Sequence, residues 1–529
     1  MTNLEIPHEH ERTWRYRFFE ILPGTLSWTL LLAPLILSLI NVALAVFFIL
    51  AYILIYLTRA VAFAIRAFAG YRTMRTHTKL DWNTLVGEVE AGEVAGPAVH
   101  RPAWHYENLQ RLSITPPVVK PSEIVHAIII ATYNESREVV EPTIQAVADS
   151  LYDMKKVVLI LAYEERGGER VEKQSKELIA AYKHRFKHAM AVKHPRDIPG
   201  EIIGKGGNIT YAGRRLQTYL EEQGIDPIRV PVTTLDADNR PDKKYLAALS
   251  YLYAVSPDPR RVAYQPLPMF TNNIWDAPAP MRVIATGNNF FYMVMTQRSH
   301  VARNFSAHAQ SMQSLIDTDF WSVRTIVEDG HHFWRSYFRY DGNYRVYPLA
   351  VPIYQDAVLA EGYLKTLKAQ FIQLRRWTYG ASDVAYIAHM GFMRKNKVPK
   401  FDLIAKFFRL LENHVNWAAG AVLLAFAAFI PVLLHPESYV ANQLPLTVRS
   451  IHTAGMVGIF ISLFIALKTL PPRPARYRRH RKVYMVLQWV YLPLTTILYG
   501  STAAFYSQTR LMLKKYLTKF DTTEKAVKK

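Results

Sequence analysis

Three stretches of this chain are too apolar to lie on an ordinary protein surface. No residue in 26–58 is charged, and 413–434 and 451–470 are almost as apolar. A helix needs about 20 apolar residues to cross the hydrocarbon of a bilayer. The first stretch is long for one crossing and slightly short for two, and each of the others fits one. The sequence therefore predicts an integral, multi-pass membrane protein.

Basic residues flank these stretches, as they do on the cytoplasmic side of membrane proteins. Arg12, Arg15 and Arg17 precede the first stretch, and Arg59 and Arg66 follow it. Because both flanks are positive, we expect a cytoplasmic segment at 1–24 and a transmembrane hairpin at 25–68 that turns near Asn41.

The same argument orients the second membrane block. The loop at 436–448 has no Lys or Arg, whereas 471–482 is strongly basic. We expect two transmembrane helices in 411–470, with the first loop outside and a basic cytoplasmic loop at 471–482. The last apolar stretch, 483–513, is broken by Pro493 and Gly500 and could be a single crossing or a re-entrant hairpin.

Composition excludes several other classes. The chain has no Cys, so disulfide frameworks and thiolate zinc sites are excluded. The net charge of +21 is not accompanied by a zinc finger or an RNA-binding signature, so no nucleic-acid partner is expected. A transporter or structural membrane protein would also explain the apolar helices, but transporters place charged residues inside their spans and these spans have almost none.

The middle of the chain reads as a soluble α/β domain over 123–360, after a linker at 69–122. Strand-like runs at 123–133, 155–163, 229–238 and 261–267 alternate with helical periodicity such as that of 171–188. This alternation predicts a mostly parallel sheet with helices on both faces. Ligands of such sheets bind beyond the carboxyl ends of the strands.

Asp236 and Asp238 stand at such a strand end, in "VTTLDADNRP". One interpretation is a surface turn, because Asp, Asn and Pro are frequent in turns. The other is a site for Mg²⁺ or Mn²⁺, since hard cations bind carboxylate oxygens together with nucleotide phosphates. Their position at the end of a strand favours the metal site.

Five motifs occur in one order: "ATYNE" at 131–135, "GKGGN" at 204–208, the "DAD" above, "IVEDG" at 326–330 and "QLRRW" at 373–377. Together they resemble membrane-bound family 2 glycosyltransferases, the branch with cellulose, chitin and hyaluronan synthases. The resemblance covers about 25–525. It implies a GT-A catalytic domain on the cytoplasmic side of the cell membrane.

The resemblance also implies roles for residues. Thr132, Tyr133 and Glu135 match positions around the nucleotide, and Lys205 and Asn208 match a motif that orients the sugar-nucleotide. The other interpretation of "GKGGN" is a flexible turn; it lacks the spacing of a Walker motif.

Asp329 is the implied general base, with Glu328 beside it, because an acceptor hydroxyl needs a group that removes its proton. Val327 stands where the family has Thr, and Asp329 could instead cap a helix. One base acting in a direct displacement implies inversion at the anomeric carbon.

Gln373, Arg376 and Trp377 match the QxxRW motif of an interfacial helix, here within 361–410. Residues three and four apart share a helix face, so Trp377 could stack on an acceptor sugar while Arg376 pairs with the diphosphate. An amphipathic interfacial helix without chemistry would also show Trp and Arg together.

The end of the chain, "KFDTTEKAVKK", resembles the FxVTxK gating loop of bacterial cellulose synthases at Phe520, Thr523 and Lys525, with Thr522 in place of Val. The alternative is an ordinary basic tail at 514–529. If the resemblance holds, the tail is cytoplasmic, the number of crossings is even, and 484–513 is a hairpin or a pair of short helices.

Two departures limit the resemblance. The second strand ends in "LILAYEER" where relatives carry Asp, so Glu164 or Glu165 would replace that contact to the base. "SAHAQSMQSL" at 306–315 lacks the glycine and paired arginines of polymer synthases. We expect metal-dependent transfer from a nucleotide-sugar, with UDP the first candidate, to a polysaccharide or glycolipid. The alternative is a non-processive enzyme that glycosylates a polyprenyl phosphate or another lipid.

Overall fold

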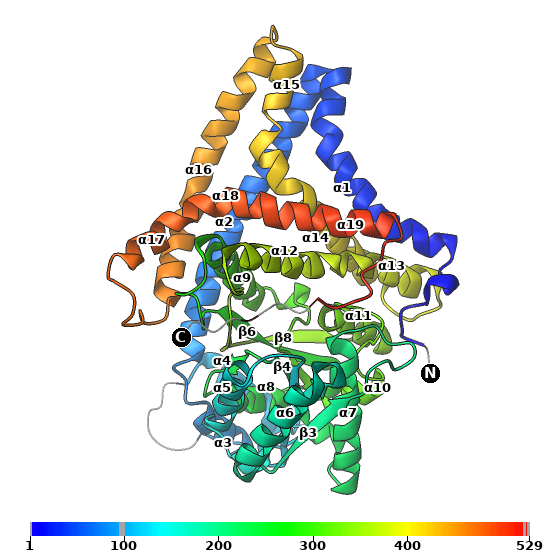
Figure 1. The fold of residues 1–529 in the computed structure, drawn as a ribbon, viewed down its shortest axis with the longest axis vertical. Helices are drawn as coiled ribbons and strands as arrows, with labels where there is room; N and C mark the ends of the chain where they lie inside the picture. Colours follow the sequence, from blue (N-terminus) through cyan, green and yellow to red (C-terminus); the bar gives the residue numbers. More distant parts are fainter. Residues whose placement is uncertain (1–2, 95–100, 522–524, 526–529) are drawn as a thin grey trace.

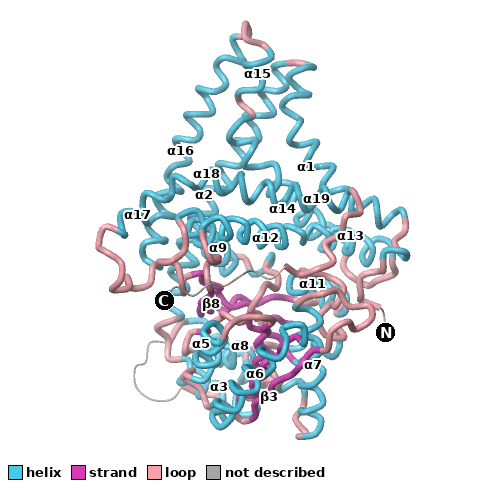
Figure 2. The backbone as a smooth tube through the Cα atoms, viewed as in Figure 1, coloured by secondary structure: helices cyan, strands magenta, loops and turns pink. Residues whose placement is uncertain are grey.

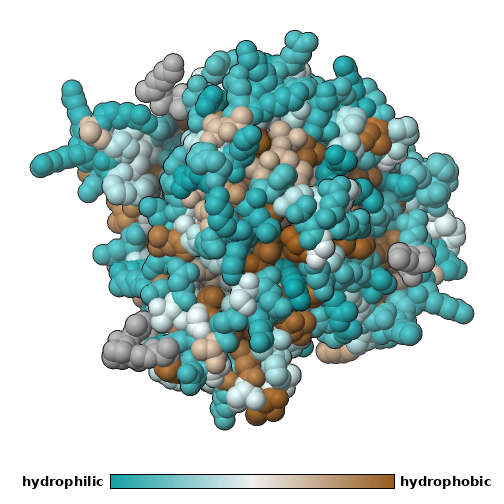
Figure 3. Space-filling view, turned by 90° about the horizontal axis from the view of Figure 1, so that it is seen from below, coloured by the Kyte–Doolittle hydropathy of each residue, from teal (hydrophilic) through white to brown (hydrophobic). Residues whose placement is uncertain are grey.

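The computed structural model describes residues 3–94, 101–521 and 525. A helical upper part stands on a lower part that contains all the described strands (Figures 1 and 2). The lower end carries mostly hydrophilic side chains with smaller apolar patches between them (Figure 3). An end of this kind is suited to contact with water.

The first apolar stretch forms two long helices, α1 (Trp14–Ile40) and α2 (Val42–His77). The chain turns at Asn41, as predicted. The Asn41 side chain accepts hydrogen bonds from the backbone N–H groups of Ala43 and Leu44, which caps the start of α2. Together the two helices extend beyond the uncharged run at both of its ends.

The second block contains α14 (Lys400–Phe426), the short α15 (Phe429–Leu434) and α16 (Tyr439–Thr469). In Figure 1 these helices and α1 and α2 converge on the upper end of the molecule. Within the described residues, four helical stretches are long and apolar enough to cross a membrane: Trp14–Ile40, Val42–His77, Tyr439–Thr469 and Arg481–Met512.

The last of these stretches differs from the other three in direction. Residues 481–512 form one continuous helical stretch, with α17 (Arg481–Leu487), α18 (Leu492–Thr495) and α19 (Thr502–Met512) joined by 3₁₀ and π turns. No hairpin forms in it. It runs across the bases of the upright helices, above α12 (Tyr363–Thr378), as Figure 1 shows. Pro493 is accommodated at the start of α18, where a missing N–H costs little.

The lower part contains an eight-stranded sheet in the order β3-β2-β1-β4-β7-β6-β8-β5. Strands β1 to β4 are mutually parallel where they pair, and β6 is parallel to β8. β7 is antiparallel to β4 and β6, and β5 is antiparallel to β8. The sheet is therefore mixed rather than mostly parallel. The strands are β1 (His126–Thr132), β2 (Val157–Glu164), β3 (His188–His194), β4 (Pro231–Asp236), β5 (Arg240–Pro241), β6 (Val262–Phe270), β7 (Ala309–Ser311) and β8 (Arg345–Gln355).

Helices cover both faces of this sheet, as predicted. Alternate residues of a strand point to opposite faces, so Ile128 and Ile130 of β1 pack with one set of helices and Ala127 and Ile129 with the other. The first set includes α5 (Arg137–Ala148), α6 (Gly168–Tyr182) and α8 (Tyr245–Ala254), and the second includes α7 (Lys205–Glu222) and α10 (Met312–Asp317).

The segment expected to be a linker, 69–122, is largely helical. It holds the end of α2, then α3 (Trp82–Ala91) and α4 (Ala103–Ile114). Trp82 and Leu85 of α3 join the core cluster that contains β1 and α8. Three further helices connect the two parts of the molecule: α9 (Ala279–Thr296), α11 (Glu328–Arg339) and α13 (Asp383–Ala388).

Candidate active site

The end of β1 holds the first group of predicted site residues. The Thr132 hydroxyl and the backbone N–H of Tyr133 both donate to the Glu135 carboxylate, each over 2.8 Å. The guanidinium of Arg166 lies 5.9 Å from the centre of the Tyr133 ring and pairs with Glu164. Glu135 thereby fixes the turn after β1, and Tyr133 presents a ring beside a cation.

The "GKGGN" segment is the first turn of helix α7, not a flexible turn. A Cβ at Gly206 would overlap the Ser322 carbonyl oxygen, so this close approach needs glycine. The Asn208 side chain is buried and donates to the carbonyl groups of Thr132, over 3.4 Å, and Ala162, over 3.1 Å. Asn208 therefore ties α7 to the ends of β1 and β2 and leaves Lys205 to face the site.

Two lysines hold the predicted metal ligands. The Lys205 ammonium lies 2.6 Å from Asp236, and the Lys525 ammonium lies 2.6 Å from Asp238. The Ser306 hydroxyl donates to the second oxygen of Asp236 over 2.6 Å. Burial raises the pKa of Asp236, but the charges of Lys205 and Lys525 outweigh burial and hold it below the ordinary value. Asp236 is therefore negatively charged in the folded protein at neutral pH.

The acid pair Glu328 and Asp329 forms the first turn of α11. Glu328 is buried, and its carboxylate lies 3.9 Å from the Lys205 ammonium. Burial and the charge of Asp329 raise the pKa of Glu328. Burial also raises the pKa of Asp329, although Lys205 opposes that shift. Asp329 accepts a hydrogen bond from the N–H of Gly330 over 2.6 Å, so the expected base also has a helix-terminal contact.

Helix α12 brings part of the QxxRW motif to the site. The Arg376 guanidinium lies 3.9 Å from the centre of the Phe520 ring and donates to the Asp521 carbonyl over 2.8 Å. Trp377 packs with Phe270, their ring centres 6.2 Å apart. Among the described residues, the Gln373 side chain has one hydrogen bond, a local one in which it accepts from Gln370 over 3.0 Å.

The tail reaches the same place. The Phe520 N–H donates to the Ile203 carbonyl over 2.7 Å, and Phe520 packs on Gly204 just before Lys205. Lys525 forms a backbone bridge with Leu359 and pairs with Asp238. Thr523 lies outside the described residues. Phe520 and Lys525, far from the other motifs in sequence, therefore lie against Arg376 and Asp238.

Asp356 is a site residue that the sequence analysis missed. It follows β8, and its backbone N–H donates to Asp238 over 3.0 Å. Burial and the Asp238 charge raise the pKa of Asp356. An acid directly after a strand, in "YQDAV", was the available signal, the same one that identified Asp236. Ser306, which holds Asp236, had no such signal.

The oxygen groups at this place fit a hard divalent cation. Among the described residues, no three His, Asp or Glu side chains are grouped closely enough to hold a metal by themselves. However, Asp236 and Asp238 each pair with a lysine ammonium, and the buried Oδ1 of Asp356 has no hydrogen-bond partner among the described residues. Two carboxylates suit Mg²⁺, which takes its remaining ligands from water and phosphate oxygens.

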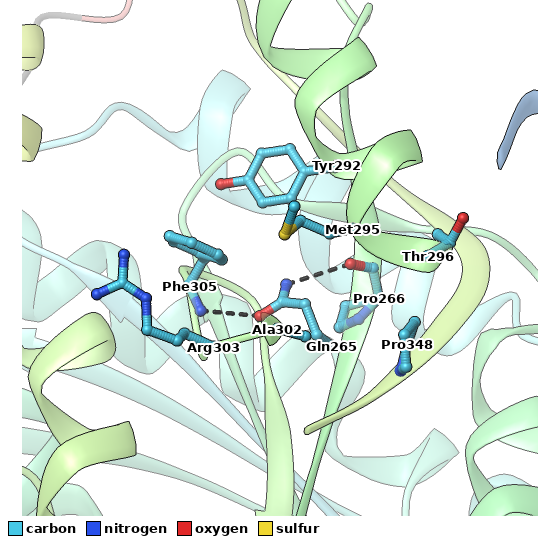
Figure 4. A pocket seen from close by; sticks show the side chains of 9 residues that line it. All are labelled: Gln265, Pro266, Tyr292, Met295, Thr296, Ala302, Arg303, Phe305 and Pro348. Atoms are coloured by element: carbon cyan, nitrogen blue, oxygen red, sulfur yellow. Dashed lines mark hydrogen bonds between the residues drawn. The ribbon is translucent and has the colours of Figure 1, made fainter. Parts of the chain in front are cut away.

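A small cavity lies beside the site, next to α9 (Figure 4). Its volume is about 10 Å³, room for one water molecule. The Gln265 amide accepts from the N–H of Phe305 over 2.8 Å and donates to the Pro266 carbonyl over 3.2 Å. Tyr292 and Met295 lie over Gln265, and Arg303 points away from it (Figure 4). This cavity is too small for a sugar.

The sequence matches no protein-family model and no curated protein. Solved structures resemble it weakly. The mannosyltransferase PcManGT from Pyrobaculum calidifontis, in complex with GDP-Man and Mn²⁺, is 13% identical over 85% of this chain and all of its own, with a TM-score of 0.39. S. aureus TarS 1-349, in complex with UDP-GlcNAc, is 11% identical over 66% of this chain and 93% of its own, with a TM-score of 0.36.

Proposed function

We propose that this protein is an inverting, metal-dependent glycosyltransferase of family 2 with a GT-A domain. It would transfer a sugar from a cytoplasmic nucleotide-sugar, a UDP-sugar first among the candidates, to a polysaccharide or glycolipid at the membrane. The observation that carries the proposal is the contact of Lys205 with both Asp236, at 2.6 Å, and Glu328, at 3.9 Å. One cation thus links the predicted leaving-group end of the site to Glu328, the neighbour of the predicted base Asp329.

The residues divide the reaction between them. The acceptor hydroxyl attacks the anomeric carbon, its proton passes to the Asp329 carboxylate, and the bond from that carbon to the diphosphate oxygen breaks. Asp329 is suited to this because its raised pKa brings its basicity closer to that of the developing alkoxide. The attack from the side opposite the leaving group inverts the anomeric carbon.

Lys205 and Arg376 would offset the negative charge that grows on the diphosphate. Asp236 and Asp238 would hold Mg²⁺ or Mn²⁺, which supplies Lewis-acid assistance to the departing diphosphate. Lys525, which pairs with Asp238 here, would then exchange that carboxylate for a phosphate oxygen.

The direct test uses the full-length protein in detergent, a panel of UDP- and GDP-sugars, and MnCl₂ or MgCl₂. Nucleotide release and product mass are measured. We expect turnover with at least one donor and its loss in Asp238→Asn, because this change removes one of the two charged ligands. Asp242→Asn is the control. Undiminished turnover after chelator treatment would refute the metal role, and no turnover with any donor would contradict the proposed function.

A further inference from the structure

Three arginines and one histidine outside the active site lie close enough to interact electrostatically at the junction of the two parts of the molecule. They are Arg66 of α2, Arg409 of α14, and Arg298 and His300 just after α9. These four residues are named the junction cluster here. They come from three separate segments of the chain, so the basic flank of the first apolar stretch accounts for Arg66 but not for the other three.

Contacts between the segments bring the cluster together. A Cβ at Gly70 of α2 would overlap the Met293 carbonyl oxygen of α9, so these helices touch about one turn beyond Arg66. The Gln297 amide donates to the Thr73 hydroxyl of α2 over 3.0 Å. Arg59 of α2 pairs with Glu412 of α14, which joins the third segment.

The junction cluster has little counter-charge among the described residues: Asp402 acts on Arg409, but it forms its ion pair with Lys406. In the part of the chain that the structure describes, none of its four side chains forms an ion pair. Basic neighbours do: Arg59 pairs with Glu412 and Lys406 with Asp402. Burial, then the charges of Arg66 and Arg409, lower the pKa of Arg298. Burial and the surrounding cations likewise lower the pKa of His300. The cluster is therefore a place of mutual repulsion that an anion would relieve.

Exposed apolar side chains lie close to two of these residues in sequence, on α2 and α14. Ile65, next to Arg66, is 57% exposed, and Phe408, next to Arg409, is 60% exposed. Phe401, Ile404 and Phe408 lie on one face of α14 and are all exposed. Arg66 lies about 10 Å along α2 beyond Arg59, toward the sheet. Cations near exposed apolar groups, at this position along α2, are suited to binding an amphiphile rather than a soluble anion.

We propose that Arg66, Arg298, His300 and Arg409 bind the phosphate of a membrane lipid, whose hydrocarbon chains lie against the apolar side chains of α2 and α14. Guanidinium groups bind phosphate oxygens through paired, charge-assisted hydrogen bonds. Basic pockets between helices on the cytoplasmic side of a membrane are suited to such headgroups. This site does not depend on the proposed sugar transfer.

The test is native mass spectrometry of the full-length protein with added phosphatidic acid, and with diacylglycerol as the lipid that lacks phosphate. The double variant Arg66→Gln, Arg298→Gln is compared with Arg478→Gln, Arg479→Gln, which removes the same charge from the exposed basic loop. We expect phosphatidic acid to bind at least about 10-fold more tightly than diacylglycerol. The junction variant should lose about 10-fold or more in affinity, and the loop variant less than about 2-fold.

Inorganic phosphate distinguishes the lipid from a free anion. It should compete only weakly, because it lacks the hydrocarbon that the apolar side chains hold. Equal binding of the two lipids, equal losses in both variants, or tight binding of inorganic phosphate alone would each overturn the proposal. Because the measurement is lipid retention, it tests the lipid-binding proposal independently of nucleotide-sugar turnover.

Discussion

At the scale of the residue, two carboxylates that look alike in sequence have different surroundings. Asp236 contacts Ser306 and Lys205, the first residue of α7. Asp238 contacts Lys525 and the backbone of Asp356. Asp236 is therefore tied to the side of the site that holds the predicted base, and Asp238 to the side that holds the tail. Changes at the two positions should have different effects.

The Asp329→Asn variant tests the base. We expect transfer to fall by about 10²-fold or more while the affinity for the nucleotide-sugar stays nearly the same, because the amide cannot remove a proton. Single-turnover rates and equilibrium binding of the donor separate the two effects. Asp319→Asn, at an exposed aspartate in the loop before α11, is the control. Parallel losses of affinity and rate would point to a structural or metal-binding role instead.

The pH dependence of transfer tests the electrostatics of the same residue. Burial raises the pKa of Asp329 and Lys205 lowers it, so Lys205→Met should raise it further. Because the base must be deprotonated, kcat/KM falls as pH drops below this pKa. The acidic limb of the profile should therefore move to higher pH in Lys205→Met and stay in place in Lys243→Met. A limb that does not move would show that Lys205 does not act on the base.

At the scale of the element, the tail is the segment whose position sequence patterns specify least. Tyr516 anchors its start, accepting from Arg17 over 2.9 Å and donating to Glu20 over 2.9 Å. Beyond that anchor, Phe520 packs on Gly204 and Lys525 reaches Asp238. We expect the tail to open and close over the site by breaking and remaking the contacts of Phe520 and Lys525, while Tyr516 keeps its start in place.

Truncation after Tyr516 tests whether the tail takes part in turnover. We expect kcat to fall by about 10-fold or more, because closure over the nucleotide would be lost. The point variant Lys525→Met should reproduce much of this loss, and Lys515→Met, at an exposed lysine, should not. Full activity of the truncated chain would contradict the gating hypothesis without affecting the proposed transferase function.

At the scale of the whole molecule, the direction of 481–512 determines the topology. Its composition allows a crossing, yet it lies across the upright helices beside α12 (Figure 1). Buried polar contacts hold it there: the Ser27 hydroxyl donates to Gln508 over 2.6 Å, and Gln508 donates to the His414 carbonyl over 2.9 Å. We therefore expect an even number of crossings, made by α1, α2, α14 with α15, and α16.

A topology reporter fused after Lys529 checks this arrangement. It should lie in the cytoplasm, on the same side as a reporter placed before Trp14, since four crossings return the chain to its starting side. A reporter inserted at Glu437, in the loop between α15 and α16, should lie outside. An outer location of the C-terminal reporter would mean that 481–512 crosses the bilayer.

Local sequence patterns were sufficient to predict many of the helices and strands of this molecule. The turn near Asn41 was predicted from the basic residues on both flanks of one long apolar run. β1, β2, β4 and β6 were predicted from apolar runs, three of them rich in β-branched residues. Asp236 and Asp238 followed from their place after such a run. For the strands and the two carboxylates the signal lies among neighbouring residues, so no knowledge of the fold was needed.

Only the tertiary structure decided the rest. β7 and β5 are too short for a pattern, and their antiparallel pairing made the sheet mixed. The pairing of Lys525 with Asp238, the place of Asp356 and the crosswise path of 481–512 depend on contacts between distant segments. Hydropathy measures how well a helix tolerates lipid, but partners such as Ser27 and His414 decide where that helix lies.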